Sequence, residues 1–477
     1  MRGIVWFRED LRINDNPALF NASRDCHDGI IGVFIIDSSM WHEHNVAACR
    51  VDFILRGLTE LNHELSKLNI PLIIIEVRST KDIPQVLHKL TEEFKVQALF
   101  FNRQYEVNEK KRDLLVINYL KQKNISCSVY DDQIIFLPDD LKTQQGSYYK
   151  VFTSFKNAWY QRFHRQERMK LLPKPKSQQP LNITSSSIPN KITGFNSTID
   201  PNLWPAGENS AAKQLKFFIK NNLHDYAKCR DFPSLDCTSK LSPYLSAGMI
   251  SVKTCFHAAL IANNDEIESG GKGAGTWISE LIWREFYKYI LIVFPRISMN
   301  KAYKIETEKL HWHYDEKKFK CWQQGLTGYP IIDAAMRQLN TTGWMHNRLR
   351  MVTAMFLAKN LFFDWRLGEK YFITNLIDGD LAANNGNWQW CASTGVDAVP
   401  YFRIFNPIRQ SERFDPQGNF IRKFCPELNE FDDYAIHHPE ARNPSLAFKV
   451  NYPSPIVDLE KSRQYAINAH RALGKVT

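Results

Sequence analysis

Short β-branched runs alternate with amphipathic stretches over residues 1–130, and this alternation constrains the fold more than any other feature of the sequence. The clearest helix between the runs is Arg50–Leu68, where apolar side chains recur at helical spacing. Strands that are separated by helices pair in parallel, so we expect a doubly wound parallel sheet. The expected strands are Ile4–Phe7, Ile30–Ile36, Leu72–Val77, Ala98–Phe101 and Ser126–Tyr130.

The pattern changes after the expected sheet. Residues 173–210 are rich in Pro, Ser, Asn and Gln and lack apolar periodicity, which is typical of a linker. Helical spacing then dominates from 211 to 425, and a closing helix is expected near Leu459–Leu473. We predict an α/β plus all-α chain, with a sheet domain at 1–130, an interdomain linker at 131–210 and a helical domain at 211–477. The clearest helices of the last domain are Thr276–Phe294, Ile331–Leu339 and Leu349–Leu361.

Composition narrows the class of protein. Lys plus Arg exceed Asp plus Glu by 61 to 51, and the resulting charge of +10 favours polyanionic partners such as nucleic acid. The nine cysteines form no C-x-x-C pair, so we expect reduced thiols and no metal site. No run of 18 apolar residues occurs, and the chain enters its first strand without a charged leader. We therefore expect a cytoplasmic protein that does not contact membranes.

The candidate cofactor site does not lie on the first turn of the sheet, because Trp6–Arg12 contains no glycine for a dinucleotide. Polar residues set among aromatic ones instead form four segments, Thr238–Gly248, Trp277–Tyr287, Gly343–Met351 and Asp378–Asn385. These segments closely resemble the flavin-pocket motifs of the photolyase and cryptochrome family. The resemblance extends to Trp6–Arg12 and Tyr149–Thr153, so it covers nearly the whole chain except the linker and tail.

The resemblance implies a class I photolyase, which repairs cyclobutane pyrimidine dimers in DNA with light and reduced, anionic FAD. Thr238, Ser239 and Ser242 offer hydroxyl and N–H groups where a helix begins, which suits a pyrophosphate. Lys240 stands where the family has arginine. Lysine keeps the positive charge but lacks the planar guanidinium that can donate two parallel hydrogen bonds to a phosphate. The full set expected to bind FAD is Tyr226, Thr238, Ser239, Lys240, Leu241, Ser242, Trp277, Arg284, Trp344, Asn347, Arg350, Asp378, Asp380 and Asn384.

The resemblance also implies a site for damaged DNA, single- or double-stranded, into which a flipped dimer enters. Glu280 is expected to hydrogen-bond a pyrimidine and, when protonated, to stabilise its radical anion. Asn347 and Met351 replace histidines of the enzymes for (6-4) photoproducts, which favours dimer repair. The residues expected at the dimer are Glu280, Trp283, Asn347, Met351 and Trp390, and those expected at the phosphates are Arg230, Arg348 and Arg403.

Two further groups follow from the same resemblance. Trp312, Trp365 and Trp388 match a relay that carries electrons from the surface to the flavin. In the N-terminal domain, three residues match positions that hold a 5,10-methenyltetrahydrofolate antenna: His44, Asn108 and Glu109. A lysine that the folate site would take from the helical domain is not cleanly placed, since Met299 and Lys301 both fall near it. A deazaflavin, or no antenna at all, stays open.

Two other functions remain as alternatives to repair by a monomeric enzyme. A cryptochrome would sense blue light and signal through partners, but only about 80 residues follow the matched flavin and relay region, without the long extension that sensors often carry. A passive DNA or nucleotide binder would keep the basic surface and would not need three relay tryptophans.

Overall fold

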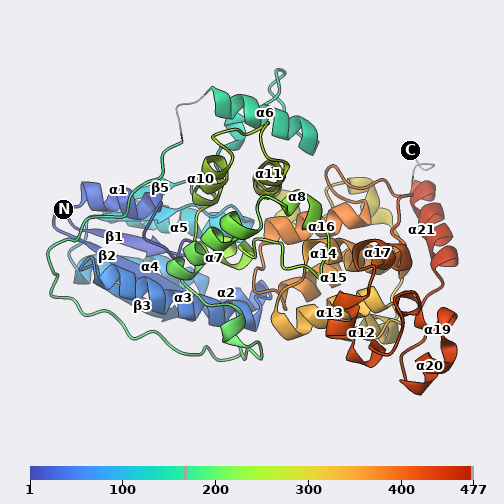
Figure 1. Ribbon diagram of the computed structural model, residues 1–477. Coiled ribbons are helices and arrows are strands. Elements are labelled where there is room, and N and C mark those ends of the chain that lie inside the picture. The colour runs from blue at the N-terminus through green and yellow to red at the C-terminus, as the bar shows by residue number, and fades with distance from the viewer. Residues whose placement is uncertain (166–168, 474–477) are drawn as a thin grey trace. The chain divides into compact units, whose positions relative to one another are not determined.

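The computed structural model describes residues 1–165 and 169–473. Its contacts divide the chain into two units, each built from several segments (Figure 1). We call Met1–His224, Ser239–Pro295 and Ile377–Gly379 the sheet unit, and Asp225–Thr238, Arg296–Leu376 and Asp380–Thr477 the helical unit. The domain boundaries drawn from the sequence, 1–130, 131–210 and 211–477, stay a prediction.

The sheet unit contains a five-stranded parallel sheet, as the sequence predicts. Its strands are β1 (Gly3–Phe7), β2 (Ile30–Asp37), β3 (Leu72–Val77), β4 (Ala98–Asn102) and β5 (Ser126–Tyr130). Their order is β3-β2-β1-β4-β5, which confirms the doubly wound topology. Because β1 has β2 on one side and β4 on the other, the winding reverses at β1, and the carboxyl ends of these strands open a crevice there.

Helices cover both faces of this sheet (Figure 1). Side chains of α4 (Ile83–Glu93) and α5 (Val107–Gln122) share one apolar core with Ile4 and Trp6 of β1. On the opposite face Gly32 leaves room for Leu65 of α3 (Ala48–Ser66), the helix predicted at Arg50–Leu68. Two further helices precede these, α1 (Pro17–Asp25) and α2 (Ser38–Glu43).

The rest of the sheet unit is helical and includes the long helix α11 (Lys272–Val293), which begins four residues before the predicted start. A Cβ on Gly273 would lie 1.9 Å from the carbonyl oxygen of Leu223, so glycine permits the close packing of this first turn. Residues 169–200 contain no helix or strand, in keeping with the predicted linker. The other helices are α6 (Phe152–His164), α7 (Glu208–Asn221), α9 (Ser242–Ser246) and α10 (Val252–Ala262).

The helical unit encloses a second core, which is rich in tryptophan. The predicted helix Leu349–Leu361 is α14 (Asn347–Met355) followed by a π-helical turn at Phe356–Asn360, because one apolar pattern runs through both. The closing helix α21 (Leu459–Leu473) lies where the sequence predicts it. The other helices are α8 (Tyr226–Cys229), α12 (Glu316–Gln324), α13 (Pro330–Thr342), α15 (Trp365–Ile373), α16 (Leu381–Ala392), α17 (Pro407–Phe414), α18 (Asn419–Phe424), α19 (Pro439–Arg442) and α20 (Pro444–Lys449).

The cysteines differ from the expectation at one pair. Cys229 and Cys237 form a disulfide with their Cα atoms 6.0 Å apart, so the prediction of reduced thiols throughout is wrong there. A turn of the chain brings the two residues together, which spacing alone does not signal. The other seven cysteines are thiols. None of the helices within 1–165 and 169–473 combines the length and the apolar character that a bilayer crossing requires.

Candidate functional site

The residues singled out in the sequence fall in both units, and each group is described within its own unit. The sheet unit holds Ser239, Lys240, Leu241, Ser242, Trp277, Glu280, Trp283, Arg284, Asp378 and the three antenna residues. The helical unit holds Tyr226, Arg230, Thr238, Trp312, Trp344, Asn347, Arg348, Arg350, Met351, Trp365, Asp380, Asn384, Trp388, Trp390 and Arg403.

Helix α11 presents the expected polar and aromatic stripe. Trp277 is buried against Phe218, with ring centroids 4.8 Å apart, whereas Glu280 and Arg284 are half-buried one and two turns further along. The Nη1 atom of Arg284 donates to the backbone oxygen of Gln133 at 2.7 Å. Backbone contact therefore fixes the direction of this guanidinium, while the Glu280 carboxyl lies on the same face.

Trp283 already has an aromatic partner within the sheet unit. Its ring lies 3.6 Å from the ring of Phe152 at an interplanar angle of 10°, a stacked arrangement. Phe152 is the fourth residue of the segment Tyr149–Thr153. One face of the Trp283 indole is thus covered by the protein, which holds the ring in a fixed plane for whatever meets its other face.

Glu285, which the sequence reasoning missed, anchors α11 from inside. It is 1% exposed, and its carboxyl accepts hydrogen bonds from Ile135 N (2.7 Å), Phe136 N (3.0 Å) and Trp159 Nε1 (2.8 Å). Burial raises the pKa of Glu285, and the donated hydrogen bonds oppose that rise. A glutamate at an apolar position next to Arg284 was the only local signal of this role.

The predicted phosphate-binding segment surrounds the start of α9. Ser239, Lys240 and Ser242 are half-buried, and Gln214 Nε2 donates to the backbone oxygen of Ser239 at 2.9 Å. Lys240 has a φ of 51°, a left-handed conformation that is uncommon for lysine. Helix α9 has only five residues, so hydroxyl groups and the Lys240 ammonium supply most of the attraction for an anion here.

The three residues predicted to hold an antenna lie together in the sheet unit. Asn108 Nδ2 is 3.1 Å from His44 Nε2, and His44 Nδ1 is 3.3 Å from Glu109 Oε1. Burial raises the pKa of Glu109 to about 8 and lowers the pKa of His44, so both are neutral at pH 7. Within the described residues Glu109 Oε2 has no hydrogen-bond partner. A buried, protonated carboxyl group without a protein acceptor can donate its hydrogen bond to an acceptor atom of a bound ligand.

The crevice at the carboxyl end of the sheet is small. Its cavity measures about 120 Å³, well under the roughly 300–1,000 Å³ of common ligand pockets. Its own side chains fill it: Arg8 pairs with Asp113 at 2.9 Å and lies over the Trp6 ring, which Arg112 also covers. His44 and Glu109, which are predicted to hold an antenna, line this same crevice.

In the helical unit, α16 places two key side chains one turn apart. Asn384 is buried, and its Nδ2 donates to the backbone oxygen of Glu369 at 3.0 Å. That bond uses one of the two amide N–H groups, so the second N–H and the side-chain oxygen are what Asn384 offers to a ligand. Trp388 follows at i+4 on the same face. Asp380 caps the helix by accepting from Ala383 N at 2.9 Å.

Behind Asn384 lies a buried hydrogen-bond chain that the sequence reasoning did not identify. Glu369 Oε1 accepts from Asn385 Nδ2 at 2.9 Å, and Asn385 Oδ1 accepts from Gln389 Nε2 at 2.7 Å. Gln389 Oε1 in turn accepts from Tyr303 N at 2.8 Å. Burial raises the pKa of Glu369 from 4.5 to about 7. The network that orients α16 therefore contains a carboxyl that changes charge near neutral pH.

We expect Glu369→Gln to stabilise the protein at pH 8 and to change its stability little at pH 5. The unfolded carboxyl ionises near 4.5, but the folded one holds its proton until about 7, so wild-type stability falls as pH rises between these values. Glutamine mimics the protonated acid and escapes that loss, which is on the order of 3 kcal/mol at pH 8. Denaturant unfolding at both pH values measures the difference, and an equal effect at pH 5 and pH 8 would contradict it.

The predicted relay tryptophans belong to the core of the helical unit. Trp365 and Trp388 are fully buried, and in the described part of the chain neither indole N–H has an acceptor. A Cβ on Gly368 would lie 2.0 Å from the Trp388 ring, so glycine lets this indole lie directly on α15, the helix that Trp365 begins. Trp312 is half-buried at the edge of this core. A further buried indole, Trp322, stands edge-on to Trp388 at 6.1 Å.

The segment Gly343–Met351 spans the start of α14. Helix α14 begins at Asn347, so Trp344 precedes the helix and does not share a helical stripe with Asn347 and Met351. Asn347 is also exposed, because it occupies the first helical position next to the capping His346. It is therefore not a core amide and can reach a ligand. Arg350 Nε donates to the backbone oxygen of Met345 at 2.8 Å.

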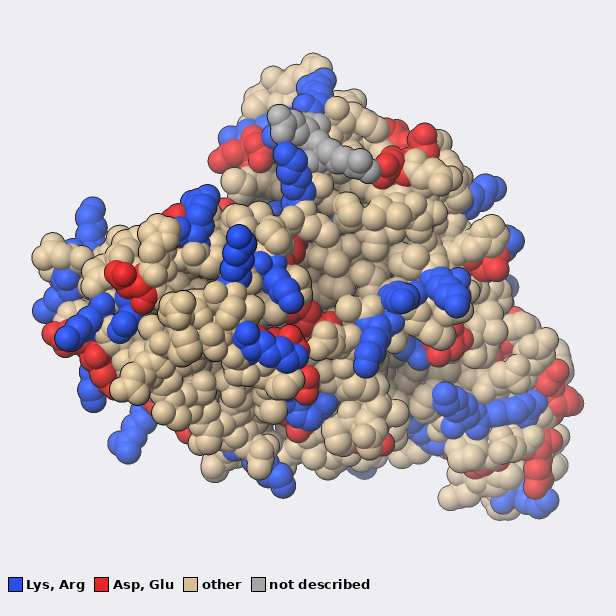
Figure 2. All heavy atoms as spheres, turned by 60° about the vertical axis from the view of Figure 1, so that its left-hand side comes forward, with Lys and Arg blue, Asp and Glu red and all other residues tan. Residues whose placement is uncertain are grey.

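Two of the three arginines expected at DNA phosphates lie beside one carboxylate, that of Asp231. Arg348 pairs with Asp231 at 2.8 Å and lies over the Phe414 ring at 4.5 Å, and Arg230 Nε is 4.0 Å from the same carboxylate. Arg403 is exposed. Lys and Arg side chains occur in separate groups with acidic residues among them on the face in Figure 2, which does not show one continuous basic patch. Phosphate binding at Arg348 thus competes with Asp231.

A buried lysine fixes the backbone that carries Arg403. Lys359, in the π-helical turn, is 0% exposed, and its Nζ donates to the backbone oxygens of Pro400 (3.5 Å), Tyr401 (3.4 Å) and Arg403 (3.3 Å). Burial lowers the pKa of Lys359 to about 7. Carbonyl dipoles thus compensate the buried ammonium, and the loop is held in one conformation.

Comparisons with known proteins agree on one family. A family model described as DNA photolyase matches residues 3–177, and a model described as the FAD binding domain of DNA photolyase matches 277–472. Proteins named deoxyribodipyrimidine photo-lyase from Salmonella typhimurium and Escherichia coli are 42% and 41% identical, with 99% of each chain covered.

Solved structures give the same result. A class III photolyase from Agrobacterium tumefaciens superposes with a TM-score of 0.87 at 34% identity, covering 99% of this chain and 98% of its own. An archaeal photolyase from Sulfolobus tokodaii, described with two FAD molecules, gives 0.82 at 31% identity and covers 99% and 100%. A Synechocystis cryptochrome gives 0.87 at 26% identity and covers 98% and 99%.

Proposed function

The chain belongs to the DNA photolyase family, and from this premise we propose that it is a deoxyribodipyrimidine photo-lyase that repairs cyclobutane pyrimidine dimers in DNA with light. The observation that carries the proposal is full-length similarity at more than 40% identity to proteins named for this activity, together with the flavin-binding segments described above. FAD, when bound and reduced, supplies an electron to the dimer after it absorbs light and receives the electron back.

The residues present fit a reduced, anionic flavin. Ser239, Ser242 and Lys240 supply hydroxyl groups and one positive charge to a pyrophosphate. Asn384 donates one N–H to Glu369 O and offers its second N–H and its amide oxygen, and this uncharged amide adds no negative charge beside the cofactor. The other residues proposed to bind FAD are Tyr226, Thr238, Leu241, Trp277, Arg284, Trp344, Asn347, Arg350, Asp378 and Asp380.

The buried indoles suit electron transfer to the cofactor. Within residues 1–165 and 169–473 the N–H groups of Trp388 and Trp365 have no acceptor, so an oxidised indole there keeps its proton and can take an electron from its neighbour. Trp312 lies at the edge of the core, where it can receive an electron from a donor in solvent. We propose that oxidation passes from Trp388 to Trp365 to Trp312, which activates an oxidised enzyme.

The residues proposed at the lesion hold and polarise the dimer rather than react with it. Trp283, fixed in its plane by Phe152, offers one face to a flipped pyrimidine pair, and Trp390 is proposed as a second wall. Glu280 is placed to hydrogen-bond a pyrimidine as negative charge develops on it. Asn347 and Met351 lack an acid–base group, which supports the dimer over the (6-4) lesion as substrate.

We expect Glu280→Ala to lower the yield of dimer repair by about tenfold, because it removes a hydrogen bond worth about 1.5 kcal/mol to a charged group. Repair per absorbed photon is measured on an oligonucleotide with one thymine dimer. Glu93→Ala, at an exposed glutamate of α4, serves as the matched control and should repair like wild type. Unchanged yield in Glu280→Ala would remove this carboxyl from the reaction.

The experiment that tests the function itself uses a defined lesion. The purified protein, loaded with FAD and reduced, is illuminated with an oligonucleotide that carries one thymine dimer, and dimer loss is compared with a dark control. Loss of the dimer in light alone supports the proposal. A yellow, photoreducible protein that leaves the dimer intact favours the cryptochrome alternative, whose fold the Synechocystis relative shares.

We propose that a folate, 5,10-methenyltetrahydrofolate, serves as antenna beside His44, Asn108 and Glu109. Glu109 is neutral at pH 7 and its Oε2 faces no partner in the described residues, so it can donate to a heterocyclic nitrogen or oxygen. His44 and Glu109 both line the crevice at the carboxyl end of the sheet. Absorption spectra of the protein purified with added folate test this assignment.

The remaining proposals concern setting and partners. We propose a cytoplasmic monomer that acts on damaged DNA, single- or double-stranded, with phosphates bound near Arg230, Arg348 and Arg403. Lys359 supports this role by holding the Arg403 backbone.

A further inference from the structure

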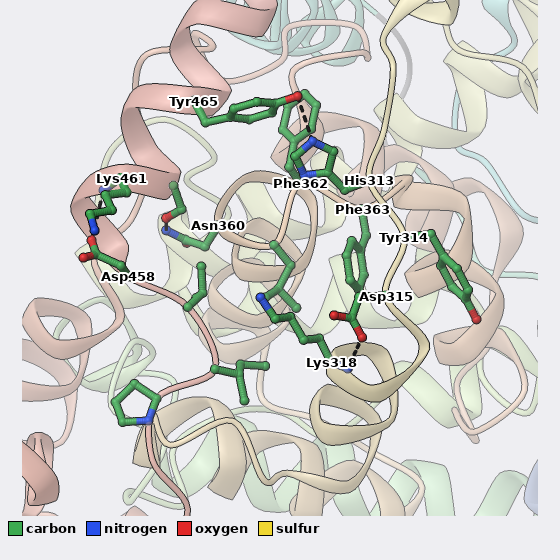
Figure 3. Close-up of a pocket in the computed structure, with 15 residues that line it drawn as sticks. His313, Tyr314, Asp315, Lys318, Asn360, Phe362, Phe363, Asp458, Lys461 and Tyr465 are labelled. Carbon is green, nitrogen blue, oxygen red and sulfur yellow. Dashed lines mark hydrogen bonds between the residues drawn. The ribbon is translucent and has the colours of Figure 1, made fainter.

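A cleft in the helical unit is distinct from the segments assigned to FAD and DNA. It measures about 650 Å³, within the range of roughly 300–1,000 Å³ typical of small-molecule sites. The starts of α12 and α21 and the end of the π-helical turn surround it (Figure 3). Phe362 and Phe363 form a buried aromatic wall, whereas Tyr465 is 45% exposed at its mouth.

This aromatic wall touches the outer member of the proposed relay. The Phe362 ring lies 4.9 Å from the Trp312 ring and 5.2 Å from the Tyr465 ring. His313, the next residue after Trp312, hydrogen-bonds Tyr465 at 2.7 Å and closes this end of the cleft (Figure 3). A molecule in the cleft therefore lies one aromatic ring away from Trp312.

An unsatisfied amide lines the same cleft. Asn360 is 5% exposed, and within the described residues its Oδ1 has no hydrogen-bond partner. Its Nδ2 donates to Ser462 Oγ at 3.3 Å. Buried polar oxygens are rarely left without a donor, because the desolvation is then uncompensated. The geometry thus calls for a ligand that carries an N–H group.

Two lysines flank the cleft. Lys318 and Lys461 stand in the first turns of α12 and α21, and within residues 1–165 and 169–473 neither ammonium is in an ion pair. The nearby carboxylates cap the helices: Asp315 accepts from Lys318 N at 3.1 Å and Asp458 from Lys461 N at 3.0 Å. Asp315 and Asp458 also line the cleft, and the backbone N–H and the charge of Lys461 help to lower the pKa of Asp458, so an anionic ligand at the rim competes with these carboxylates for the two ammonium groups.

We propose that this cleft binds a dihydronicotinamide nucleotide, which reduces Trp312 after the relay has oxidised it. The ring would lie against Phe362, the carboxamide N–H would donate to Asn360 Oδ1, and the phosphate would lie near Lys318 and Lys461. The inference rests on the relay role proposed above. Conversion of a dihydronicotinamide to the nicotinamide cation releases two electrons and one proton. One molecule can therefore reduce oxidised Trp312 twice, by one electron each time, and the proton passes to water.

Binding is tested in the dark on the FAD-loaded, full-length protein, with NADH as the probe and its fluorescence anisotropy as the readout. We expect saturable binding that Lys318→Glu, Lys461→Glu and Asn360→Leu each weaken by about tenfold. Lys317→Glu, at an exposed lysine of the same α12 turn that does not line the cleft, is the matched control. No saturable binding, or equal binding by all variants, overturns the proposal. The surface lysine variants decide the matter if Asn360→Leu does not fold.

Photoreduction of the oxidised flavin under blue light separates this inference from the relay proposal. With NADH as donor the rate should saturate, whereas with dithiothreitol it should rise in proportion to concentration. The ratio of the NADH rate to the thiol rate should fall by about tenfold in the cleft variants and stay the same in Lys317→Glu. An unchanged ratio overturns the cleft as a donor site. Loss of photoreduction with both donors in wild type would instead contradict the relay, and the dark titration would still decide binding.

Discussion

Replacement of Glu285 by leucine is expected to lower the free energy of unfolding by about 3 kcal/mol and to reduce the FAD content of the purified protein. The Glu285 carboxyl accepts from Ile135 N, Phe136 N and Trp159 Nε1, all within the sheet unit. Leucine leaves three buried donors unsatisfied, at about 1–3 kcal/mol each, while removal of a buried carboxyl offsets part of that loss. Because α11 carries Trp277 and Arg284, which we propose to bind FAD, its displacement should also weaken cofactor binding.

The measurement is denaturant unfolding followed by tryptophan fluorescence, with FAD content read from absorbance. Glu285→Gln keeps one acceptor oxygen and should fall between wild type and Glu285→Leu. Glu93→Leu, at an exposed glutamate, should unfold like wild type. If Glu285→Leu matched Glu93→Leu in both stability and FAD content, the anchoring role of Glu285 would be wrong.

The elements that the sequence predicts well are those whose signal is local. The five strands lie within one residue of their predicted ends, because β-branched runs flanked by helices specify a buried parallel strand directly. Helix α11 begins earlier than predicted, because the glycines at 271 and 273 do not indicate a helix in the sequence. The close packing of Gly273 on Leu223 explains why glycine is there. The π-helical turn after α14 has the same apolar pattern as an α-helix and is invisible in sequence.

The parts of the site that sequence could not predict depend on residues far apart in the chain. Nothing local indicates that Phe152 stacks on Trp283, or that Glu285 accepts from residue 135. Asp231 beside Arg348 is likewise a tertiary contact. The cleft next to Trp312 is assembled from three segments that lie between residues 313 and 465. Its amide oxygen, Asn360 Oδ1, which has no partner in the described residues, is recognised only when all three segments are placed. Motif resemblance names candidate residues, but only packing shows which groups are already occupied.

Trp388→Phe is expected to lower the rate of flavin photoreduction by about 100-fold, which corresponds to about 2.7 kcal/mol in the barrier. Phenylalanine keeps an aromatic ring in the core but is much harder to oxidise than indole, so the first hop is lost. The rate is followed by flavin absorbance under blue light with dithiothreitol as the final donor. Repair by chemically reduced enzyme should change little, because that reaction needs no relay.

Trp322→Phe provides the control that distinguishes a relay from general damage to the core. Trp322 is as buried as Trp388 and stands edge-on to it at 6.1 Å, but its indole N–H donates to the backbone oxygen of Thr353. Loss of packing should be similar in the two variants, whereas only Trp388→Phe should lose photoreduction. Equal loss in both, after correction for bound FAD, would mean that disturbed packing limits the rate and that oxidation does not pass through Trp388 in particular.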